Sequence, residues 1–229
     1  MDIVLEAKQI VRAFKTGAGE DFYALKGVDM QVPRGTLTIL KGRSGSGKTT
    51  LLNILSALDD PTSGEVIFDG APFRQMSMAG KEELRRKQIG FVFQSVALIP
   101  IMNAYENVDF AMRLAEIKGD YRSQIESALK IVGMNERMLH MPGQMSGGEQ
   151  QRIAIARAIA HKPKVLFADE PTGALDTESG IRVMKLFRRL IEKEGITIVM
   201  TTHDPNLMEL GDVIYEMEDG ELAEIKRIN

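Results

Sequence analysis

Short apolar runs rich in β-branched residues alternate along this chain with longer segments of helical periodicity. The clearest short runs are 36–40, 165–169 and 196–201. The last two lack the alternation of apolar and polar residues that a half-exposed strand shows, which indicates strands covered on both faces. Such an order of elements is typical of βαβ units that feed a largely parallel sheet.

A helix is expected between the last two of these strands. Apolar residues recur there at helical spacing, namely Val183, Met184, Leu186, Phe187, Leu190 and Ile191. Gly195 follows them, at the place where a glycine commonly ends a helix. The segment 165–201 is therefore predicted to form a strand, a helix and a second strand.

The N-terminal third and the middle of the chain depart from this pattern. Turn-forming residues at 33–35, 61–64 and 69–70 separate short runs, which indicates an antiparallel layer joined by turns. The middle of the chain contains no convincing strand and is expected to form helices and loops. We predict an α/β fold in one domain, 1–229. Its parts are a core with the β layer, 1–94 and 161–229, and a helical subdomain, 95–160.

Composition and charge exclude several classes of function. The 229 residues include 29 Lys and Arg and 32 Asp and Glu, interspersed along the chain, with a net charge of -3. Because no basic field marks a nucleic-acid binder, no nucleic-acid partner is expected. The chain has no cysteine, which excludes disulfides and thiolate metal sites. It also lacks a secretory signal and any apolar run of about 18 residues, so a cytoplasmic location is expected.

A phosphate-binding loop is predicted at 42–49, where the sequence is Gly-Arg-Ser-Gly-Ser-Gly-Lys-Thr. The loop follows the strand 36–40 and precedes the apolar periodicity of 50–58, and this context disfavours the alternative of a glycine-rich turn that merely precedes a helix. Lys48 is expected to reach the β- and γ-phosphates, and Thr49 to bind Mg²⁺. The residues expected to contact the nucleotide here are Gly42, Arg43, Ser44, Gly45, Ser46, Gly47, Lys48, Thr49 and Thr50.

Two adjacent carboxylates end the strand 165–169, at the edge where open α/β sheets bind ligands. Asp169 is expected to hold Mg²⁺ through water, and Glu170 to polarise the attacking water. Adjacent carboxylates are often only a solvated turn. Together with a phosphate-binding loop, however, they favour a catalytic site.

Three further residues each allow two interpretations. His203 closes the apolar strand 196–202, and this position at a strand's carboxyl end favours a role in the site over a structural one, whereas His140 and His161 are expected to be structural. Gln94 is expected to contact metal or water, although an isolated glutamine at such a position would be assigned to the surface. Phe14 either stacks on a base or belongs to the core.

The segment 145–152, Met-Ser-Gly-Gly-Glu-Gln-Gln-Arg, resembles the signature sequence of the ATP-binding cassette (ABC) ATPases. This resemblance covers essentially the whole chain. Ser146, Gly147, Gly148 and Glu149 would then form a second anion-binding site at a helix N-terminus. The alternative is an ordinary helix cap at Ser146. Three residues differ from those most frequent at their positions in the family motifs, namely Arg43, Met145 and Glu149. None of these differences removes a carboxylate or a group that donates a hydrogen bond to phosphate.

The resemblance implies an ABC-type phosphate-loop NTPase fold, with a RecA-like core, an antiparallel β layer and a helical subdomain. It also implies that Phe14 stacks on adenine, that Gln94 senses the nucleotide and binds metal, that Glu170 is the catalytic carboxylate and that His203 is the switch histidine. The segment 174–176 resembles the loop that touches the opposite subunit. The cofactors implied are ATP and Mg²⁺, bound between two copies of the chain in a head-to-tail homodimer.

A finer resemblance is to the exporter-like branch of the family, which includes lipoprotein-release and macrolide-exporter cassettes. It depends on the segments 58–64, 89–94 with 98–100, and 168–176. This resemblance implies an integral membrane permease as partner and a location on the cytoplasmic face of the membrane. A mechanical or signalling role without solute transport stays open. A soluble cassette acting on ribosomes or DNA is disfavoured, because such forms typically carry fused cassettes or long insertions. The transported substrate is not indicated.

Overall fold

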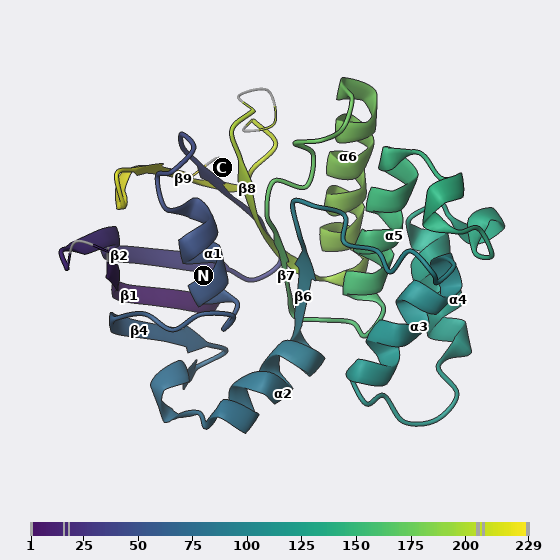
Figure 1. Ribbon diagram of the computed structural model, residues 1–229, viewed down its shortest axis with the longest axis horizontal. Coiled ribbons are helices and arrows are strands. Elements are labelled where there is room, and N and C mark those ends of the chain that lie inside the picture. The colour runs from purple at the N-terminus through teal and green to yellow at the C-terminus, as the bar shows by residue number, and fades with distance from the viewer. Residues whose placement is uncertain (1, 16, 18, 205–206, 208, 228–229) are drawn as a thin grey trace. The chain divides into compact units, whose positions relative to one another are not determined.

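The computed structural model describes residues 2–15, 17, 19–204, 207 and 209–227 (Figure 1). Its fold consists of two compact units. One contains Met1–Glu82 and Thr197–Asn229, and the other contains Glu83–Ile196.

An antiparallel layer forms one side of the first unit. Its strands are β1 (Ile3–Lys15), β2 (Asp21–Pro33), β4 (Ser63–Phe68) and β5 (Ala71–Pro72), in the order β2-β1-β4-β5. A bulge between Lys8 and Val11 interrupts the pairing of β1 with β4. Gly64 faces this bulge with φ 95°, and a Cβ there would lie 2.3 Å from the Gln9 carbonyl oxygen. The antiparallel layer predicted from the turn residues is confirmed.

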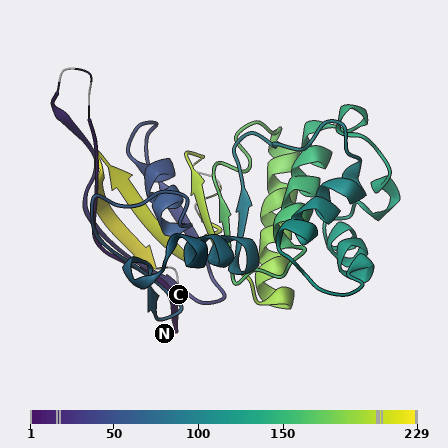
Figure 2. The same ribbon diagram turned by 60° about the horizontal axis from the view of Figure 1, so that its bottom comes forward.

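A largely parallel group of strands completes the first unit. It contains β3 (Leu37–Lys41), β8 (Thr197–Thr202), β9 (Val213–Glu218) and β10 (Glu221–Arg227). Strand β3 pairs in parallel with both β8 and β9, and β10 pairs antiparallel with β9. Helix α1 (Lys48–Leu55) lies between β8 and the antiparallel strands β1 and β2 (Figure 2). Because both faces of β3 and β8 are covered, their residues are apolar or small without alternation.

Helices dominate the second unit, which also contains a pair of parallel strands, β6 (Ile89–Val92) and β7 (Val165–Ala168). The helices are α3 (Ala104–Leu114), α4 (Arg122–Ile131), α5 (Gly147–Ile159) and α6 (Thr177–Glu194), with short 3-10 helices at Asn135–Arg137 and Pro142–Gln144. Helix α5 contacts α3, α4, α6 and β6, and it is buried on most of its circumference (Figure 1). Helix α2 (Met78–Gln88) leads directly into β6.

Helix α6 shows why the periodicity of the chain was informative. Val183, Met184, Phe187 and Leu190 are almost fully buried, and Gly195 ends the helix with φ 68°. The predicted order of strand, helix and strand over 165–201 is confirmed, as is the α/β fold class. The division into a core and a helical subdomain at 95–160 stays a prediction, although the described structure has no strand in that range. None of the described helices combines the length and the apolar character needed to cross a bilayer.

Candidate functional site

The phosphate-binding loop connects β3 to α1 in the first unit, and its glycines have both unusual backbone angles and close neighbours. Gly42 has φ 152° and Gly47 has φ 106°. A Cβ would lie 2.3 Å from the Met217 carbonyl oxygen at Gly42 and 2.6 Å from the Ala24 carbonyl oxygen at Gly47. A side chain at either position would therefore displace the loop from the strands that support it.

The start of α1 is suited to an anion. Gly47 caps the helix without a side-chain hydrogen bond, and the first turn contains no acidic residue. The backbone N–H groups of that turn and the helix dipole therefore act without a competing carboxylate. Ser46 adds a hydroxyl that is buried without a hydrogen-bond partner. The loop thus fits a phosphate chain, with Arg43, Ser44, Gly45 and Thr49 exposed and Thr50 half-buried beside it.

Lys48 is folded over the same loop. Its side chain is 5% exposed, and its ammonium group donates hydrogen bonds of 2.8 Å to the carbonyl oxygens of Gly42 and Arg43. These bonds hold the charge of the lysine over the glycine-rich segment. The structure therefore holds the Lys48 ammonium against the backbone of the loop, and its contact with the β- and γ-phosphates stays a prediction.

Phe14 is exposed on β1, so the alternative that it belongs to the core is wrong. Its side chain is 41% exposed, and the Arg12 guanidinium lies 4.6 Å from the centre of the ring. Arg12 is held in turn by an ion pair of 2.9 Å with Asp59. Sequence reasoning missed Arg12, although residues two apart on a strand share a face. The stacking of Phe14 on adenine stays a prediction.

The second unit brings Gln94, Asp169 and Glu170 together. Val92 on β6 pairs with Ala168 on β7, so both strands end at the same level. The Asp169 N–H donates 2.9 Å to the Val92 carbonyl oxygen, and the Gln94 side-chain amide donates 3.2 Å to Oε2 of Glu170. The carboxylates therefore lie at an edge shared by two parallel strands, in contact with the predicted sensor glutamine.

Glu170 holds this position with a left-handed backbone conformation, φ 43°. The Gly173 N–H donates 3.0 Å to the Glu170 carbonyl oxygen, and a Cβ on Gly173 would lie 3.4 Å from Oε2 of Glu170. A left-handed conformation in a residue with a side chain is uncommon and often marks a functional site. Asp169 beside it is 8% exposed.

The signature segment forms the N-terminus of α5. The Glu149 N–H donates to Oγ of Ser146 at 3.2 Å, and the Ser146 N–H donates to Oε2 of Glu149 at 2.9 Å. This second bond, together with the Arg137 guanidinium at 3.7 Å, holds the pKa of Glu149 below its usual value. The Glu149 carboxylate therefore completes a capping box. Its contact with nucleotide stays a prediction.

The two signature glycines have different surroundings. A Cβ on Gly148 would lie 2.9 Å from Oγ of Ser179, at the start of α6, so this glycine lets the two helices pack closely. A Cβ on Gly147 would meet only Leu175, at 4.0 Å. Gly147 is exposed and leaves the backbone open to a ligand.

The histidines separate as expected. His161 is largely buried beneath β6, where a ring nitrogen lies 3.0 Å from the Ile89 carbonyl oxygen, and burial lowers the pKa of this histidine. Its structural role is confirmed. His203 follows β8 in the first unit and is exposed. His140 contacts Arg137 at 3.0 Å.

Sequence reasoning also missed Arg157 of α5. Its guanidinium donates 2.6 Å to the Ala97 carbonyl oxygen and 3.5 Å to the Val96 carbonyl oxygen, in the segment that follows Gln94. Burial lowers the pKa of Arg157. The sequence signal that could have identified Arg157 is its position as a single cation among the apolar residues of 153–160.

Comparisons with known proteins agree with this arrangement. A family model described as ABC transporter matches residues 25–173. The chain belongs to the ABC transporter family. This ABC protein is 44% identical to the uncharacterized ABC transporter ATP-binding protein MJ1508 of Methanocaldococcus jannaschii, over 97% of this chain and 99% of that protein. It is 42% identical to the lipoprotein-releasing system ATP-binding protein LolD 2 of Rhodopirellula baltica, over 97% of this chain and 90% of that protein.

A solved structure extends the likeness to a nucleotide complex. The dimeric ATP-binding cassette MJ0796 of Methanocaldococcus jannaschii, in a post-hydrolysis state with ADP and Pi, matches this chain with a TM-score of 0.90. The identity is 38%, over 98% of this chain and 99% of that one. This ABC ATPase therefore has the predicted fold, and the prediction that it is an ATP-hydrolysing cassette is confirmed.

Proposed function

We propose that this ABC ATPase drives an integral membrane permease of an exporter-like system, one that extrudes a lipid or peptide or performs efflux, from the cytoplasmic face of the membrane. The likeness to LolD 2 at 42% identity supports the exporter-like branch. The observation that carries the proposal is an exposed apolar loop that follows Gln94 along the chain. Ile101 in this loop is 83% exposed.

The structure explains how this loop is held outward. Asn107 on α3 is fully buried, and its amide oxygen accepts a hydrogen bond of 2.8 Å from the Ile99 N–H. Its amide nitrogen donates to three carbonyl oxygens, those of Ile99 at 3.2 Å, Met102 at 2.9 Å and Asn103 at 3.0 Å. One carboxamide thus fixes the loop in a conformation that leaves Ile101 in solvent.

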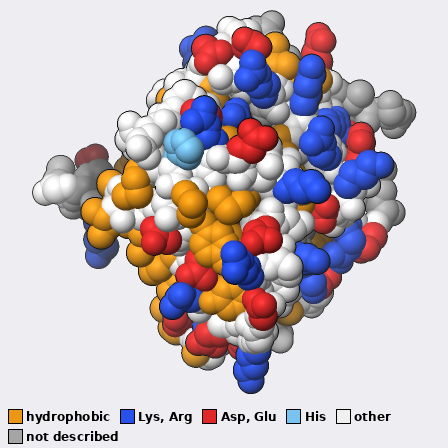
Figure 3. Space-filling view, turned by 90° about the vertical axis from the view of Figure 1, so that its right-hand side faces the viewer, with side chains coloured by type: hydrophobic (Ala, Val, Ile, Leu, Met, Phe, Trp, Pro, Cys, Tyr) orange, Lys and Arg blue, Asp and Glu red, His pale blue; other side chains and the backbone are white. Residues whose placement is uncertain are grey.

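A second apolar side chain lies close to this loop. The Ala104 and Tyr105 N–H groups donate to the His140 and Met138 carbonyl oxygens, at 3.0 and 2.8 Å, which brings Leu139 beside the start of α3. Leu139 is 75% exposed. In the view of Figure 3, hydrophobic side chains gather near the centre of the face. Exposed apolar patches of this kind commonly mark protein–protein contacts.

In this proposal, each chain supplies two half-sites for ATP. Phe14 stacks on the adenine, and the phosphates are bound by Lys48 and the backbone of 42–50. On their other side, the same phosphates are bound by another copy of the chain in a head-to-tail homodimer, through its Ser146, Gly147 and Gly148. The openness of Gly147 and the uncapped start of α1 support these two roles.

The residues of the second unit act on water. Glu170 accepts the proton of the attacking water, and Gln94 orients the Glu170 carboxylate through the 3.2 Å hydrogen bond. His203 is the third proposed catalytic residue, as the switch histidine that the family resemblance implies. Thr49 and Gln94 are the proposed direct protein ligands of Mg²⁺, and Asp169 is proposed to hold the ion through water, since Mg²⁺ usually keeps several waters. Mg²⁺ would neutralise charge on the phosphates.

A first experiment tests the catalytic assignment. Glu170→Gln should bind ATP normally but lower turnover by about 100-fold or more, the usual contribution of a general base. It should also form a dimer in ATP on gel filtration. Lys48→Ala should instead lose ATP binding. Glu126→Gln, which removes an exposed carboxylate on α4, is the matched control and should keep native activity. Native turnover in Glu170→Gln would show that the role is assigned to the wrong residue.

The shared site is tested by mixing two inactive chains. Lys48→Ala and Ser146→Arg damage different half-sites, so some mixed dimers would contain one intact site. Activity above the sum of the separate variants supports a site shared between copies. Activity equal to that sum contradicts it.

The permease surface is tested with aspartate. Ile101→Asp, Met102→Asp and Tyr105→Asp should keep ATPase activity in the isolated chain but lose assembly with the permease that co-purifies with the native chain. Met78→Asp, which alters another exposed apolar residue, 74% exposed, is the control. Normal assembly and transport with all three loop variants would disprove this surface. Assembly with stimulated ATPase but no transported solute would favour a mechanical or signalling role instead.

A further inference from the structure

A hollow of about 310 Å³ in the second unit is lined by four cations and no acidic residue. We name it the basic groove, and its lining residues are Ile131, Val132, Gly133, Arg152, Arg182, Lys185, Leu186 and Arg189. The cations come from α5 and α6, and the end of α4 with its following turn supplies the remaining wall. Arg152 is the last residue of the signature segment 145–152, whereas the other lining residues lie outside the sequence motifs, and the proposed ATPase site uses none of them.

The spacing on α6 concentrates positive charge on one face. Arg182, Lys185 and Arg189 are separated by three and four residues, so they lie above one another, where like charges repel. Arg182 pairs with Glu178 one turn earlier. Within the described part of the chain, no carboxylate pairs with Lys185 or Arg189. The repulsion along this face is therefore only partly offset by the protein itself.

Arg152 brings a half-buried guanidinium to the same hollow. Its Nη2 donates to the thioether sulfur of Met134 at 3.5 Å, which is a weak acceptor. Burial lowers the pKa of Arg152, and the charge of Arg182 lowers it further, while Glu149 opposes both effects. A guanidinium that is partly removed from water, and whose hydrogen bond goes to a thioether sulfur, gains from an added anion.

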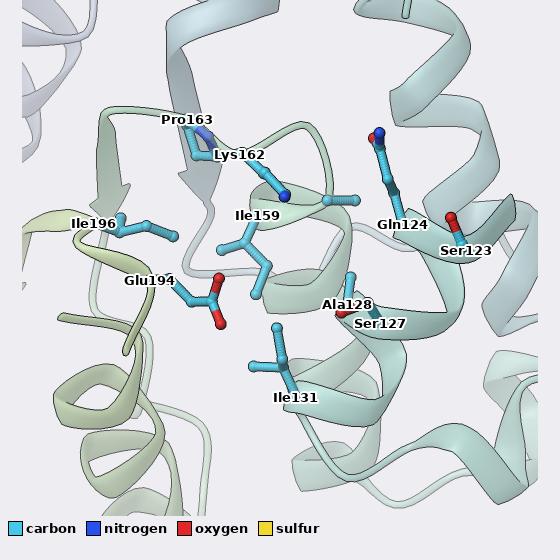
Figure 4. Close-up of a pocket in the computed structure, with 11 residues that line it drawn as sticks. Ser123, Gln124, Ser127, Ala128, Ile131, Ile159, Lys162, Pro163, Glu194 and Ile196 are labelled. Atoms are coloured by element: carbon cyan, nitrogen blue, oxygen red, sulfur yellow. The ribbon is translucent and has the colours of Figure 1, made fainter. Parts of the chain in front are cut away.

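A neighbouring pocket has a different charge pattern. That pocket, also about 310 Å³, shares Ile131 with the basic groove. Figure 4 shows both the Lys162 ammonium and the Glu194 carboxylate beside its apolar floor, so the two charges offset each other. The basic groove has no such carboxylate in its lining. In the view of Figure 3, Lys and Arg side chains also gather toward one edge of the face.

We propose that the basic groove binds a multiply charged phosphate group, carried either by a free oligophosphate or by a phosphorylated lipid head group. Arginine forks suit phosphate oxygens because each can donate two parallel hydrogen bonds. Arg152 and Arg182 lie near the N-terminal ends of α5 and α6, whose first turns contain the signature and the segment at Asp176. An anion bound in the groove would therefore contact both α5 and α6, next to the signature segment.

The test separates this groove from the phosphate-binding loop. Inorganic tripolyphosphate is titrated by calorimetry, at an ionic strength of about 0.15 M, where charges more than about 8 Å away are screened, into the Lys48→Ala chain, in which the first site is disabled. The groove variant adds Lys185→Gln and Arg189→Gln to this background. The matched control adds Lys130→Gln and Lys193→Gln, which remove the same charge from α4 and α6 outside the groove. Circular dichroism confirms that each chain is folded.

The groove variant should bind tripolyphosphate at least about tenfold more weakly than the parent, and the control should change by less than about twofold, because screened charges at a distance contribute little. A second arm measures sedimentation with phosphatidylcholine vesicles, with and without phosphatidic acid. Tripolyphosphate binding that depends on the groove identifies a free oligophosphate, and vesicle binding alone that depends on the groove identifies a lipid. Equal effects of the two variants on both probes, or no binding of either probe, overturns the proposal.

Discussion

Arg157 offers a sharp test of how the signature helix is connected to Gln94, the proposed nucleotide sensor. Its guanidinium, on α5, donates 2.6 Å to the carbonyl oxygen of Ala97, which itself has a left-handed backbone with φ 49°. Gln94 lies three residues before Ala97 and bonds to Glu170. Arg157→Met keeps most of the apolar stem of the side chain and removes the donors. Arg157→Lys keeps the charge but not the planar fork.

The cost of Arg157→Met follows from the contacts. A hydrogen bond with a charged donor contributes about 1.5–3 kcal/mol, and the second contact at 3.5 Å is too long to add much. Burial of the guanidinium, seen in its lowered pKa, opposes this gain, and the exposed Ala97 can bond to water after the substitution. We therefore expect a loss of about 1–2 kcal/mol in the free energy of unfolding.

The effect on catalysis should be distinct from the effect on stability. Without Arg157 the segment after Gln94 loses its tie to α5, so Gln94 orients Glu170 less well. We expect kcat to fall by about tenfold with little change in KM, which is the pattern of a lost transition-state interaction. Arg157→Lys should recover part of kcat.

Urea unfolding and steady-state ATPase assays on the same preparations separate the two quantities. The Arg113→Met variant, which removes an exposed arginine paired with Asp109 on α3, serves as control. The reasoning fails if Arg157→Met retains native kcat and unfolds within about 0.5 kcal/mol of the parent, the range of ordinary surface substitutions.

Three further predictions concern single contacts. Gly90→Ala places a Cβ 2.3 Å from the Ala158 carbonyl oxygen and should lower the free energy of unfolding, measured in urea, by about 1–3 kcal/mol; a change within error would show that β6 and α5 adjust freely. Glu149→Ala removes the capping box and should cost about 1 kcal/mol at neutral pH. Because the folded pKa of Glu149 is lowered from 4.5, this contribution is present above that value and is lost as the pH falls through the folded pKa, so the two unfolding curves should converge in acid. His161 has a folded pKa lowered from 6.5 by burial, so the native chain should lose stability as the pH falls below that value. A His161→Gln variant should show a flatter dependence of Tm on pH, and equal slopes would contradict the assignment.

Most of the fold could be predicted from local sequence patterns, because strand burial, helical spacing and glycine conformation depend on residues only a few positions apart. The strands β7 and β8 are buried along their whole length without alternation, and α6 has helical spacing that ends at a glycine with φ 68°. The phosphate-binding loop was predictable for the same reason, since its glycines serve backbone conformations within a few residues. The capping box at Ser146 was considered as an alternative and is present.

Contacts between distant segments could not be predicted in this way. Arg157 bonds to a carbonyl 60 positions away, and nothing in the spacing of α5 identifies that acceptor. Arg12 is linked to Asp59 across 47 positions. The cations of α6 resemble an ordinary solvated helix face until the structure places Arg152 in the same hollow. Each of these features depends on tertiary packing.

The left-handed backbone at Glu170, with φ 43°, has a consequence for how this chain can change. Such a conformation costs a residue with a side chain of the order of 1 kcal/mol or more, and glycine or asparagine adopts it more easily. Replacement of Glu170 by either residue would thus relieve local strain while removing the carboxylate. Given the catalytic role proposed for Glu170, random substitution followed by selection for thermal resistance alone would tend to enrich inactive chains at this position. Under the same proposal, selection that also requires ATP turnover would keep a glutamate there.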